Sequence, residues 1–304
     1  MIVKTSDVHS IQPFLKRLHL PKPKSHKGQN GKVLIIGGSS LFHAASIWAA
    51  EVASHFADIV HYSSTKENNE IMLSLKKFFR NGIVIPHTQL HHYLEEDDAI
   101  LVGPGMVRGK VNEKIKAEVE TFLEILKIKD EASYSHYLTK YLLEKYPKKR
   151  FVFDAGALQM MDRAWLRNTQ ERPILTPHQK EFQQVFGINI SEATLENKGK
   201  IVKEYAKKYR CVILLKAIVD IISDGESTVF VEGGNQGLTK GGTGDVLAGL
   251  ALSLFARNDP LESAVLASFF LKKTADELYK AYGYWYNISD IINHLPNTVK
   301  RLVF

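Results

Sequence analysis

The chain has 304 residues, of which 44% are hydrophobic, and it carries a formal net charge of +7 with an isoelectric point near 9.2. Its apolar segments are short, none reaches the roughly 18 uninterrupted residues that cross a bilayer, and the start lacks a signal-peptide core. We therefore expect a cytoplasmic protein with no membrane partner. The lysines are spread over many segments without interleaved aromatic residues, which argues against a nucleic-acid partner and favours phosphorylated small molecules.

The predicted elements begin with a strand over 32–36, which a Gly-Gly-Ser turn joins to an alanine-rich helix over 44–57. Further strands are predicted over 58–63, 82–85, 99–103, 151–154, 173–176, 211–216, 220–223 and 227–231. Helices are predicted over 112–126, 180–186, 191–209, 245–255, 261–279 and 289–294. Apolar strands that alternate with helices predict a mostly parallel sheet covered on both faces.

The charged stretch over 127–149 is interpreted as a surface helix-loop insertion, not a domain boundary. No internal repeat or low-complexity linker divides the chain. We therefore expect one α/β domain over 1–304.

The strongest candidate for chemistry is a glycine-rich run that leads from a strand into a helix. Six glycines fall within 233–244, and the run ends in Gly-Gly-Thr-Gly-Asp. The backbone amides of Gly242, Thr243 and Gly244 can point at one anion, with the positive end of the helix behind them. Asp245 in the first helical turn could then accept a proton from a substrate hydroxyl, so the run predicts an anion hole next to a catalytic base.

Two common nucleotide motifs do not fit this chain. Lys240 precedes the final glycines of the run, which disfavours an ordinary P-loop. The third glycine of the segment 103–109 falls one position too late for a dinucleotide fingerprint. A glycine turn whose Asp245 only complements the helix dipole is the alternative.

Seven motifs in order resemble the NAD(P)H-hydrate dehydratase family, a branch of the ribokinase-like superfamily. They are His-Lys-Gly at 26–28, the glycine turn after 32–36, Val-Gly-Pro-Gly at 102–105, Asp-Ala at 154–155, Thr-Pro-His with a glutamate three residues later at 176–181, Leu-Lys at 215–216 and the run ending at 245. The resemblance spans nearly the whole chain. It implies a ribokinase-like, three-layer α/β/α fold with a central, mostly parallel sheet.

The resemblance also implies an ADP-dependent or ATP-dependent reaction on hydrated NADH or NADPH, with Mg²⁺ on the phosphates and a homo-oligomeric enzyme. A separate NAD(P)H-hydrate epimerase would supply the epimerisation step, because no epimerase domain fits before His26. The metal ligands are not evident. By resemblance, the hydrate site comprises Ala45, Gly105, His178 and Asp245, and the nucleotide site comprises Lys216, Ala217, Ile218, Val219, Asp220 and Gly244.

The residues themselves leave several roles open. His178 follows a short strand, so it can project at the carboxyl edge of the sheet, although a lone histidine is more often structural. Glu181 fits a ligand role or the start of a helix equally well. Asp154 fits substrate, a water-bound metal or a turn cap. Asn235, inside the glycine run, is a further candidate supporting residue.

The chain departs from the family pattern at several positions. Residues 40–44 read Ser-Leu-Phe-His-Ala where small residues are usual, so the loop over the substrate is expected to differ in shape. Gly156 stands where Asp is common, and Ala217 where Gly is common. Thr239-Lys240 replaces Ala-Thr, which puts a cation beside the phosphate loop; Lys240 could strengthen nucleotide binding or be a solvated surface lysine.

Two other functions remain open at this point. A small-molecule kinase of the same fold, of the hydroxyethylthiazole or pyridoxal type, would use the same Gly-Thr-Gly-Asp element on another hydroxyl. The Thr-Pro-His element at 176–178 favours the dehydratase. A catalytically silent nucleotide-binding protein is the alternative from a different class, and the retained Asp245 argues against it.

Overall fold

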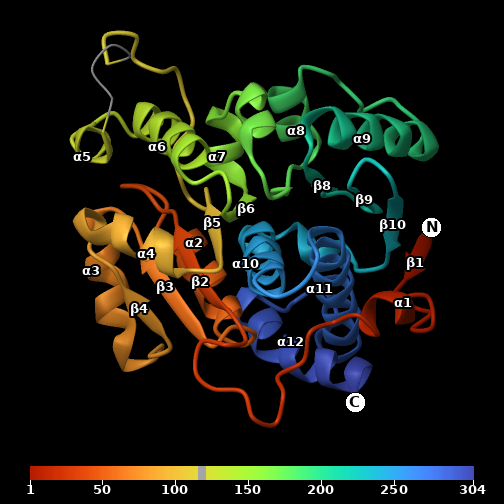
Figure 1. Ribbon diagram of the computed structural model, residues 1–304. Helices are drawn as coiled ribbons and strands as arrows, with labels where there is room; N and C mark the ends of the chain where they lie inside the picture. The colour runs from red at the N-terminus through yellow and green to blue at the C-terminus, as the bar shows by residue number, and fades with distance from the viewer. Residues whose placement is uncertain (116–120) are drawn as a thin grey trace.

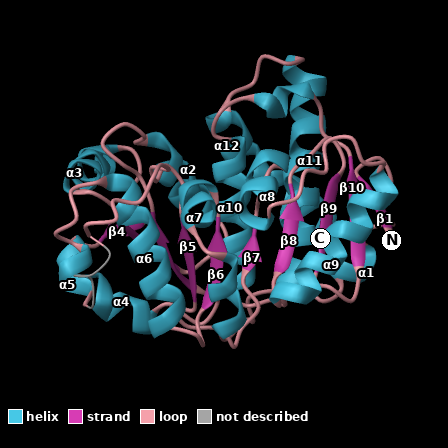
Figure 2. Cartoon of the chain, turned by 90° about the horizontal axis from the view of Figure 1, so that it is seen from above, coloured by secondary structure: helices cyan, strands magenta, loops and turns pink. Residues whose placement is uncertain are grey.

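A single twisted sheet runs through the computed structural model, which describes residues 1–115 and 121–304. Within these residues the sheet has ten strands in the order β1-β10-β9-β8-β7-β6-β5-β2-β3-β4, seen side by side in Figure 2. Only β9 pairs antiparallel with both neighbours, so the sheet is mostly parallel. The strands are β1 Ile2–Lys4, β2 Lys32–Ile36, β3 Ile59–Ser63, β4 Gly82–Val84, β5 Ala99–Val102, β6 Arg150–Phe153, β7 Ile174–Leu175, β8 Val212–Leu215, β9 Asp220–Ser223 and β10 Thr228–Glu232.

Alternate side chains of the central strands enter two separate hydrophobic cores. In β2, Val33 and Ile35 belong to one core, whereas Leu34 and Ile36 belong to the other. All four side chains are almost fully buried. Side chains of successive strand residues point to opposite faces, so a continuous apolar strand needs helices on both sides.

Helices supply those two covers (Figure 1). The layer at the bottom of Figure 1 contains α10, α11 and α12, with α2 packed on α10. Gly249 allows this approach, because a methyl group there would lie 2.5 Å from the carbonyl oxygen of Ala49. These helices, with two short ones at the same face, are α1 Gln12–Leu15, α2 Ala44–Ala53, α3 Lys66–Ser74, α10 Thr243–Phe255, α11 Pro260–Tyr282 and α12 Ile288–Val303.

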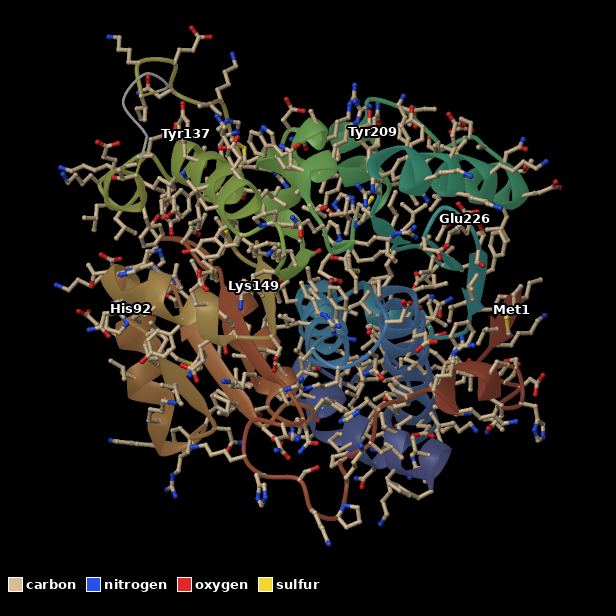
Figure 3. The ribbon with its side chains drawn as sticks, in the orientation of Figure 1. Met1, His92, Tyr137, Lys149, Tyr209 and Glu226 are labelled. Atoms are coloured by element: carbon tan, nitrogen blue, oxygen red, sulfur yellow. The ribbon has the colours of Figure 1, made fainter. Side chains whose placement is uncertain are left out.

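The opposite layer packs on the second core. Tyr137 of α6 and Tyr209 of α9, labelled in Figure 3, are both about 5% exposed in this layer. Its helices are α4 Leu90–Glu96, α5 Phe122–Ile125, α6 Glu131–Lys145, α7 Ala155–Met160, α8 Gln179–Phe186 and α9 Leu195–Tyr209. The three-layer α/β/α arrangement is the one expected from the sequence.

Two expectations differ from the structure. The charged segment 127–149 is not a surface insertion, because most of it forms α6, whose Leu138, Leu142 and Leu143 are fully buried. The helix expected over 112–126 is reduced to α5 and a turn at 113–115 in the described residues, and 116–120 lie outside them. In the segment 127–149, the charged residues between the apolar ones obscured the sequence pattern of an amphipathic helix. In the described residues, no helix has the length and hydropathy needed to cross a membrane.

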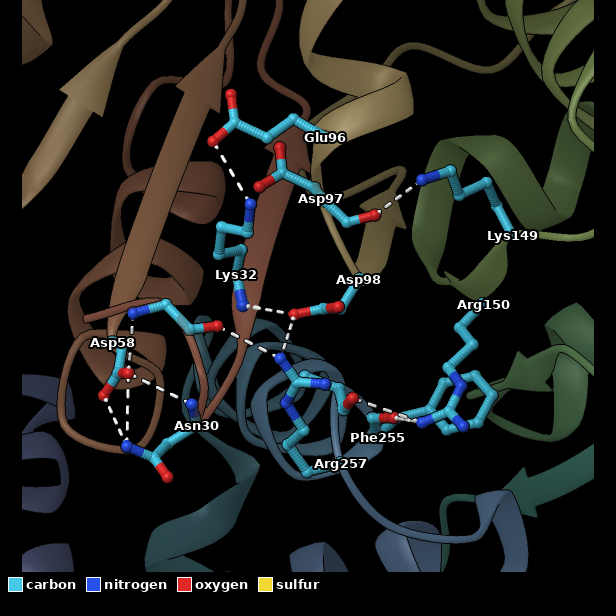
Figure 4. A network of polar contacts seen from close by, with 12 residues as sticks. Asn30, Lys32, Asp58, Glu96, Asp97, Asp98, Lys149, Arg150, Phe255 and Arg257 are labelled. Carbon is cyan, nitrogen blue, oxygen red and sulfur yellow. Dashed lines mark hydrogen bonds and ion pairs between the residues drawn. The ribbon is translucent and has the colours of Figure 1, made fainter. Parts of the chain in front are cut away.

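The amino ends of the strands are tied to the end of α10 by polar contacts (Figure 4). Arg150, at the start of β6, donates hydrogen bonds to the carbonyl oxygens of Phe255 and Ala256 at 2.8 and 3.2 Å. Arg257 lies 3.0 Å from Asp98, which also accepts the Lys32 backbone N–H. A cation at the last carbonyls complements the negative helix end. These contacts fix α10 along the sheet, with its first residue at the opposite edge.

Candidate active site

The glycine-rich run enters α10 through a residue that only glycine accommodates. After β10 the chain passes a 3₁₀ turn, η4 Gln236–Thr239, and reaches Gly242, which has φ of 103° as the N-cap of α10. A methyl group at Gly242 would lie 2.6 Å from the Trp48 ring. Thr243 and Gly244 form the first helical turn. The Thr243 N–H donates to the Lys240 carbonyl oxygen at 3.3 Å, and the Gly244 amide has no helical carbonyl to bind. This is the backbone arrangement that an anion hole requires.

Asp245 occupies the third position of α10 and has an unusual acidity for a carboxyl group. The pKa of Asp245 is raised to about 7: burial is the largest cause, the nearby carboxylates of Asp154 and Glu181 also raise it, and the Lys216 ammonium lowers it. A carboxyl group with a pKa near neutrality can both accept and release a proton at the pH of the cell. Asp245 therefore has the protonation behaviour of a general base.

Lys216 is held at the centre of the acidic groups. Its ammonium lies 2.8 Å from Asp154 and 3.8 Å from Glu181. Burial lowers the pKa of Lys216, but the carboxylates of Asp154 and Glu181 outweigh it and leave the pKa raised. A methyl group at Gly244 would lie 3.3 Å from the same ammonium. The charged Lys216 thus lies directly beside the first turn of α10.

Asp154 and Thr176 form a buried pair at the carboxyl ends of β6 and β7. The Thr176 hydroxyl donates to Asp154 Oδ1 at 2.7 Å, the same oxygen that binds Lys216. Asp154 is 2% exposed and is the N-cap residue of α7, but its side chain caps no amide of that helix. The Asp154 side chain therefore does not act as a turn cap. Its carboxylate binds the Lys216 ammonium instead.

His178 and Glu181 form a reciprocal cap at the start of α8. The Glu181 N–H donates to His178 Nδ1 at 3.2 Å, and Glu181 Oε2 accepts the His178 N–H at 2.9 Å. Because Nδ1 is an acceptor, the neutral imidazole carries its proton on Nε2. Gln159 donates to the other Glu181 oxygen at 2.9 Å. Glu181 therefore caps the start of α8 and also faces Lys216. The Nε2–H of His178 is left for a ligand.

A cleft of about 720 Å³ opens along this edge of the sheet. Lys272, from the middle of α11, closes one side of it and donates to the carbonyl oxygens of Ala217 and Ile218 at 3.2 and 2.8 Å. Asp220 accepts the Ala217 N–H at 2.8 Å, which fixes the loop after β8. Of the predicted residues, those that line the cleft are His178, Lys216, Ala217, Ile218, Asp220, Asn235, Thr243 and Gly244.

Ala45 and Gly105, two of the residues predicted to bind the hydrate, adjoin each other beyond the cleft wall. A methyl group at Gly105 would lie 3.3 Å from Ala45 Cβ and 3.2 Å from Gly38 Cα. The predicted residues Val219, Gly242, Asp154, Glu181 and Asp245 also lie outside the set of cleft-lining residues. The structure thus groups most nucleotide-site residues in one cleft and places the Ala45 and Gly105 pair separately.

The departures from the family pattern have local causes. Ser40 is anchored to Glu131 of α6 through both its N–H and its hydroxyl, at 2.6 and 2.8 Å, and Leu41 and Phe42 remain exposed. Asp at position 156 would not fit, because even a methyl group on Gly156 would lie 2.3 Å from the Met106 carbonyl oxygen. Position 217 does not require glycine, because Ala217 is not among the described residues with a positive φ.

Asn235 and Tyr286 support the cleft floor together. The Tyr286 hydroxyl donates to Asn235 Oδ1 at 2.7 Å, and Asn235 Nδ2 donates to the Ala275 carbonyl oxygen at 2.8 Å. Sequence reasoning assigned no site role to Tyr286, Thr176, Gln159 or Lys272. Thr176 belongs to the Thr-Pro-His element, and Lys272 and Lys273 interrupt the apolar stretch 263–275, where a buried lysine is unusual.

Known proteins of similar sequence belong to the family that the sequence motifs resemble. A family model described as NAD(P)H-hydrate dehydratase matches residues 33–297. An ADP-dependent (S)-NAD(P)H-hydrate dehydratase of Nitrosopumilus maritimus is 32% identical over 285 residues, which cover 92% of each chain. A bifunctional NAD(P)H-hydrate repair enzyme of Methanocaldococcus jannaschii is 34% identical over 94% of this chain. This chain spans about half (51%) of that bifunctional protein's length.

Solved structures share the fold. An ADP/ATP-dependent NAD(P)H-hydrate dehydratase of Bacillus subtilis, co-crystallised with ATP and Mg²⁺, matches with a TM-score of 0.76 at 20% identity, over 96% of both chains. A ribokinase-like superfamily protein of Enterococcus faecalis matches with a TM-score of 0.78 at 21% identity, over 99% of this chain and 95% of that one. The ribokinase-like fold expected from the sequence is confirmed.

Proposed function

Because the chain belongs to the NAD(P)H-hydrate dehydratase family, a family of hydro-lyases, we propose that it uses ADP or ATP to dehydrate the hydrated forms of NADH and NADPH. The observation that carries the proposal is the position of the Asp245 carboxyl in the first turn of α10, beside the glycine run, where its pKa is raised to about 7, chiefly by burial. The dependence on ADP follows the relatives that cover nearly the same length. Asp245 is the proposed catalytic base.

The reaction begins at the hydroxyl group on the hydrated nicotinamide ring. Asp245 takes the hydroxyl proton while the oxygen attacks the terminal phosphorus of the nucleotide, and the bond between that phosphorus and the leaving phosphate oxygen breaks. The Gly244 amide and the positive end of α10 are proposed to stabilise the transferring phosphoryl group. The ammonium of Lys216, which is paired with Asp154, lies beside the same turn and lowers the pKa of Asp245.

Elimination then restores the dihydronicotinamide. The lone pair of the ring nitrogen drives the phosphorylated carbon to release inorganic phosphate. The neighbouring ring carbon then loses a proton, which the departing phosphate takes up. Phosphorylation converts hydroxide, a poor leaving group, into phosphate, a good one. Asp245 is therefore needed for the hydroxyl proton alone, and the products are the dihydronicotinamide, phosphate and the shortened nucleotide.

Magnesium is proposed to arrive on the nucleotide phosphates. The described residues hold no cluster of three or more acidic, histidine or cysteine side chains that could bind a metal ion by itself. Mg²⁺ in nucleotide sites is commonly held by one or two carboxylates, waters and phosphate oxygens, and Asp154 is the residue that fits a water-mediated contact. When bound, the ion neutralises phosphate charge.

The remaining residues are assigned by the same proposal. His178 Nε2–H would donate to the hydrate, whose site would by resemblance also include Ala45 and Gly105. The loop from Lys216 to Asp220, with Val219, would hold the adenine nucleotide, and Asn235 would support the glycine run. A single domain, a homo-oligomeric assembly and cooperation with an NAD(P)H-hydrate epimerase complete the proposal.

The experiment incubates the protein with NADH hydrate, Mg²⁺ and ADP or ATP, and measures the dihydronicotinamide and phosphate formed per nucleotide consumed. We expect one of each per nucleotide. A kinase would instead accumulate a phosphorylated product without recovery of dihydronicotinamide. A silent nucleotide-binding protein would consume no nucleotide, and either result would overturn the proposal.

A further inference from the structure

Three lysines line the cleft, and two of them are already neutralised by acidic partners. Lys216 lies 2.8 Å from Asp154. Lys272 lies 3.5 Å from Asp220 and donates to backbone carbonyl oxygens. In a partly buried site, such a pair presents little net charge to a ligand. Neither lysine therefore supplies unmatched positive charge for a polyphosphate.

Lys240 differs from both. Its ammonium donates to the Tyr284 carbonyl oxygen at 2.5 Å and lies 5.0 Å from the centre of the Tyr286 ring. Both partners are neutral, and across the described ranges 1–115 and 121–304 no carboxylate lies within 4 Å of the Lys240 ammonium. Lys240 is consequently the cleft lysine whose charge is left unmatched.

The support for Lys240 is rigid. The Tyr286 ring is 1% exposed, and its hydroxyl is hydrogen-bonded to Asn235. A methyl group on Gly237 would lie 2.3 Å from this ring, so the turn and the ring pack closely. The face of this buried ring attracts the Lys240 cation at the cleft.

The backbone of Lys240 joins the first turn of α10. Its carbonyl oxygen accepts the Thr243 N–H at 3.3 Å and the Thr243 hydroxyl at 3.0 Å. Lys240, Thr243 and Gly244 line the same cleft. An anion bound at the amides of this turn would lie within reach of a flexible four-carbon side chain that starts three residues earlier.

We propose that the Lys240 ammonium binds the phosphate chain of the adenine nucleotide at the mouth of the glycine run. This inference rests on the proposed function and adds a residue that the family pattern lacks. The ammonium uses one hydrogen for the Tyr284 carbonyl and keeps two for phosphate oxygens. A charge-assisted hydrogen bond to phosphate is stronger than one to a neutral carbonyl, so Lys240 favours phosphorylated ligands over unphosphorylated ones.

The test measures the affinities of ADP and adenosine by calorimetry, without hydrate, for the unaltered protein, Lys240→Gln and Lys240→Arg. We expect Lys240→Gln to weaken ADP binding roughly tenfold and to leave adenosine binding unchanged, because adenosine has no phosphate. Lys240→Arg should stay within about threefold of the unaltered protein, since it keeps the charge. Lys203→Gln, which removes an exposed lysine on α9, is the matched control and should change neither affinity.

Each other outcome has a distinct meaning. An equal loss for ADP and adenosine would assign Lys240 to the support of the loop and overturn the inference. Unchanged ADP binding in Lys240→Gln would overturn it as well. If the unaltered protein binds no ADP or ATP, the proposed function fails, and the inference fails with it. Thermal unfolding of each variant, expected to match the unaltered protein, separates these results from misfolding.

Discussion

The ammonium of Lys216 lies 2.8 Å from the carboxylate of Asp154, and both groups act on the acidity of Asp245. Burial is the largest cause that raises the pKa of Asp245, the Asp154 charge raises it further, and Lys216 lowers it. The acidity of the proposed base is therefore tuned by the pair of Lys216 and Asp154. Its ionisation, and with it the rate, should depend on both partners.

The pH profile of the unaltered enzyme should have an acidic limb near the pKa of Asp245. Because the base acts when ionised, kcat/KM should rise as the pH passes through about 7. Asp154→Asn removes a negative charge, so the pKa of Asp245 falls and the limb moves to lower pH. Steady-state rates between pH 5 and 9 measure both positions.

Asp98→Asn is the matched control for that shift. It breaks an ion pair of similar length, the 3.0 Å contact with Arg257, at the opposite edge of the sheet. We expect a stability loss of at most about 1 kcal/mol and no movement of the limb. If the acidic limb of the pH profile lay at the same pH in Asp154→Asn and in the unaltered enzyme, Asp154 would not tune the pKa of Asp245.

Asp245→Asn should stabilise the fold at alkaline pH. The pKa of Asp245 is about 7 in the folded protein and 3.8 for an unperturbed aspartate, so well below pH 3.8 the carboxyl is protonated in both the folded and the unfolded state and costs nothing. As the pH rises towards 7, the carboxyl ionises more readily in the unfolded chain, and folding loses stability. At about 1.4 kcal/mol per pKa unit, Asn should gain about 2 kcal/mol more at pH 8 than at pH 5. Urea unfolding at both pH values measures this; equal effects would contradict the raised pKa.

Gly241 and Gly242 are neighbours in the glycine run with opposite tolerances. Gly242 has φ of 103°, and a methyl group there meets the Trp48 ring, whereas nothing lies within 4 Å of a methyl group at Gly241. We expect Gly242→Ala to lower the free energy of unfolding by about 1–3 kcal/mol, and Gly241→Ala to change it by less than about 0.5 kcal/mol. Denaturant titration distinguishes them, and similar losses would mean that the run is not held as described.

His178 can be separated into its capping and ligand roles. His178→Ala removes the acceptor for the Glu181 N–H and should cost about 1 kcal/mol of stability. His178→Ala should also raise the KM for NADH hydrate, because it removes the Nε2–H. His178→Asn restores a good N-cap but not the Nε2–H, so its stability should return to that of the unaltered protein while its KM stays raised. If both the stability and the KM returned to the unaltered values, His178 would have a structural role alone.

The sequence predicted the strands well because their apolar runs are sharply bounded. The strands β2 and β9 have the predicted ends, and the other predicted strands shift by one residue at one or both ends. β1 was missed, since three residues with one buried side chain, Val3, carry no pattern. α6 was misread because its lysines and glutamates surround a narrow apolar stripe.

The site was predictable only in part. Asp245 and the amides of Gly242 to Gly244 follow from one continuous segment, whose chemistry is local. The pair of Lys216 and Asp154 joins two strands 62 residues apart, and no local pattern reports such a contact. Tyr286 supports Lys240 across 46 residues of sequence in the same way. Contacts of this kind depend on the strand order.

The most direct test of the account compares the unaltered protein with Asp245→Asn in the presence of NADH hydrate, Mg²⁺ and ADP or ATP. The unaltered protein should restore dihydronicotinamide absorbance and release phosphate in equal amounts. Asp245→Asn should bind the nucleotide with similar affinity and turn over at least about 100-fold more slowly. No recovery by the unaltered protein with either nucleotide, or nearly full activity in Asp245→Asn, would contradict the central claim.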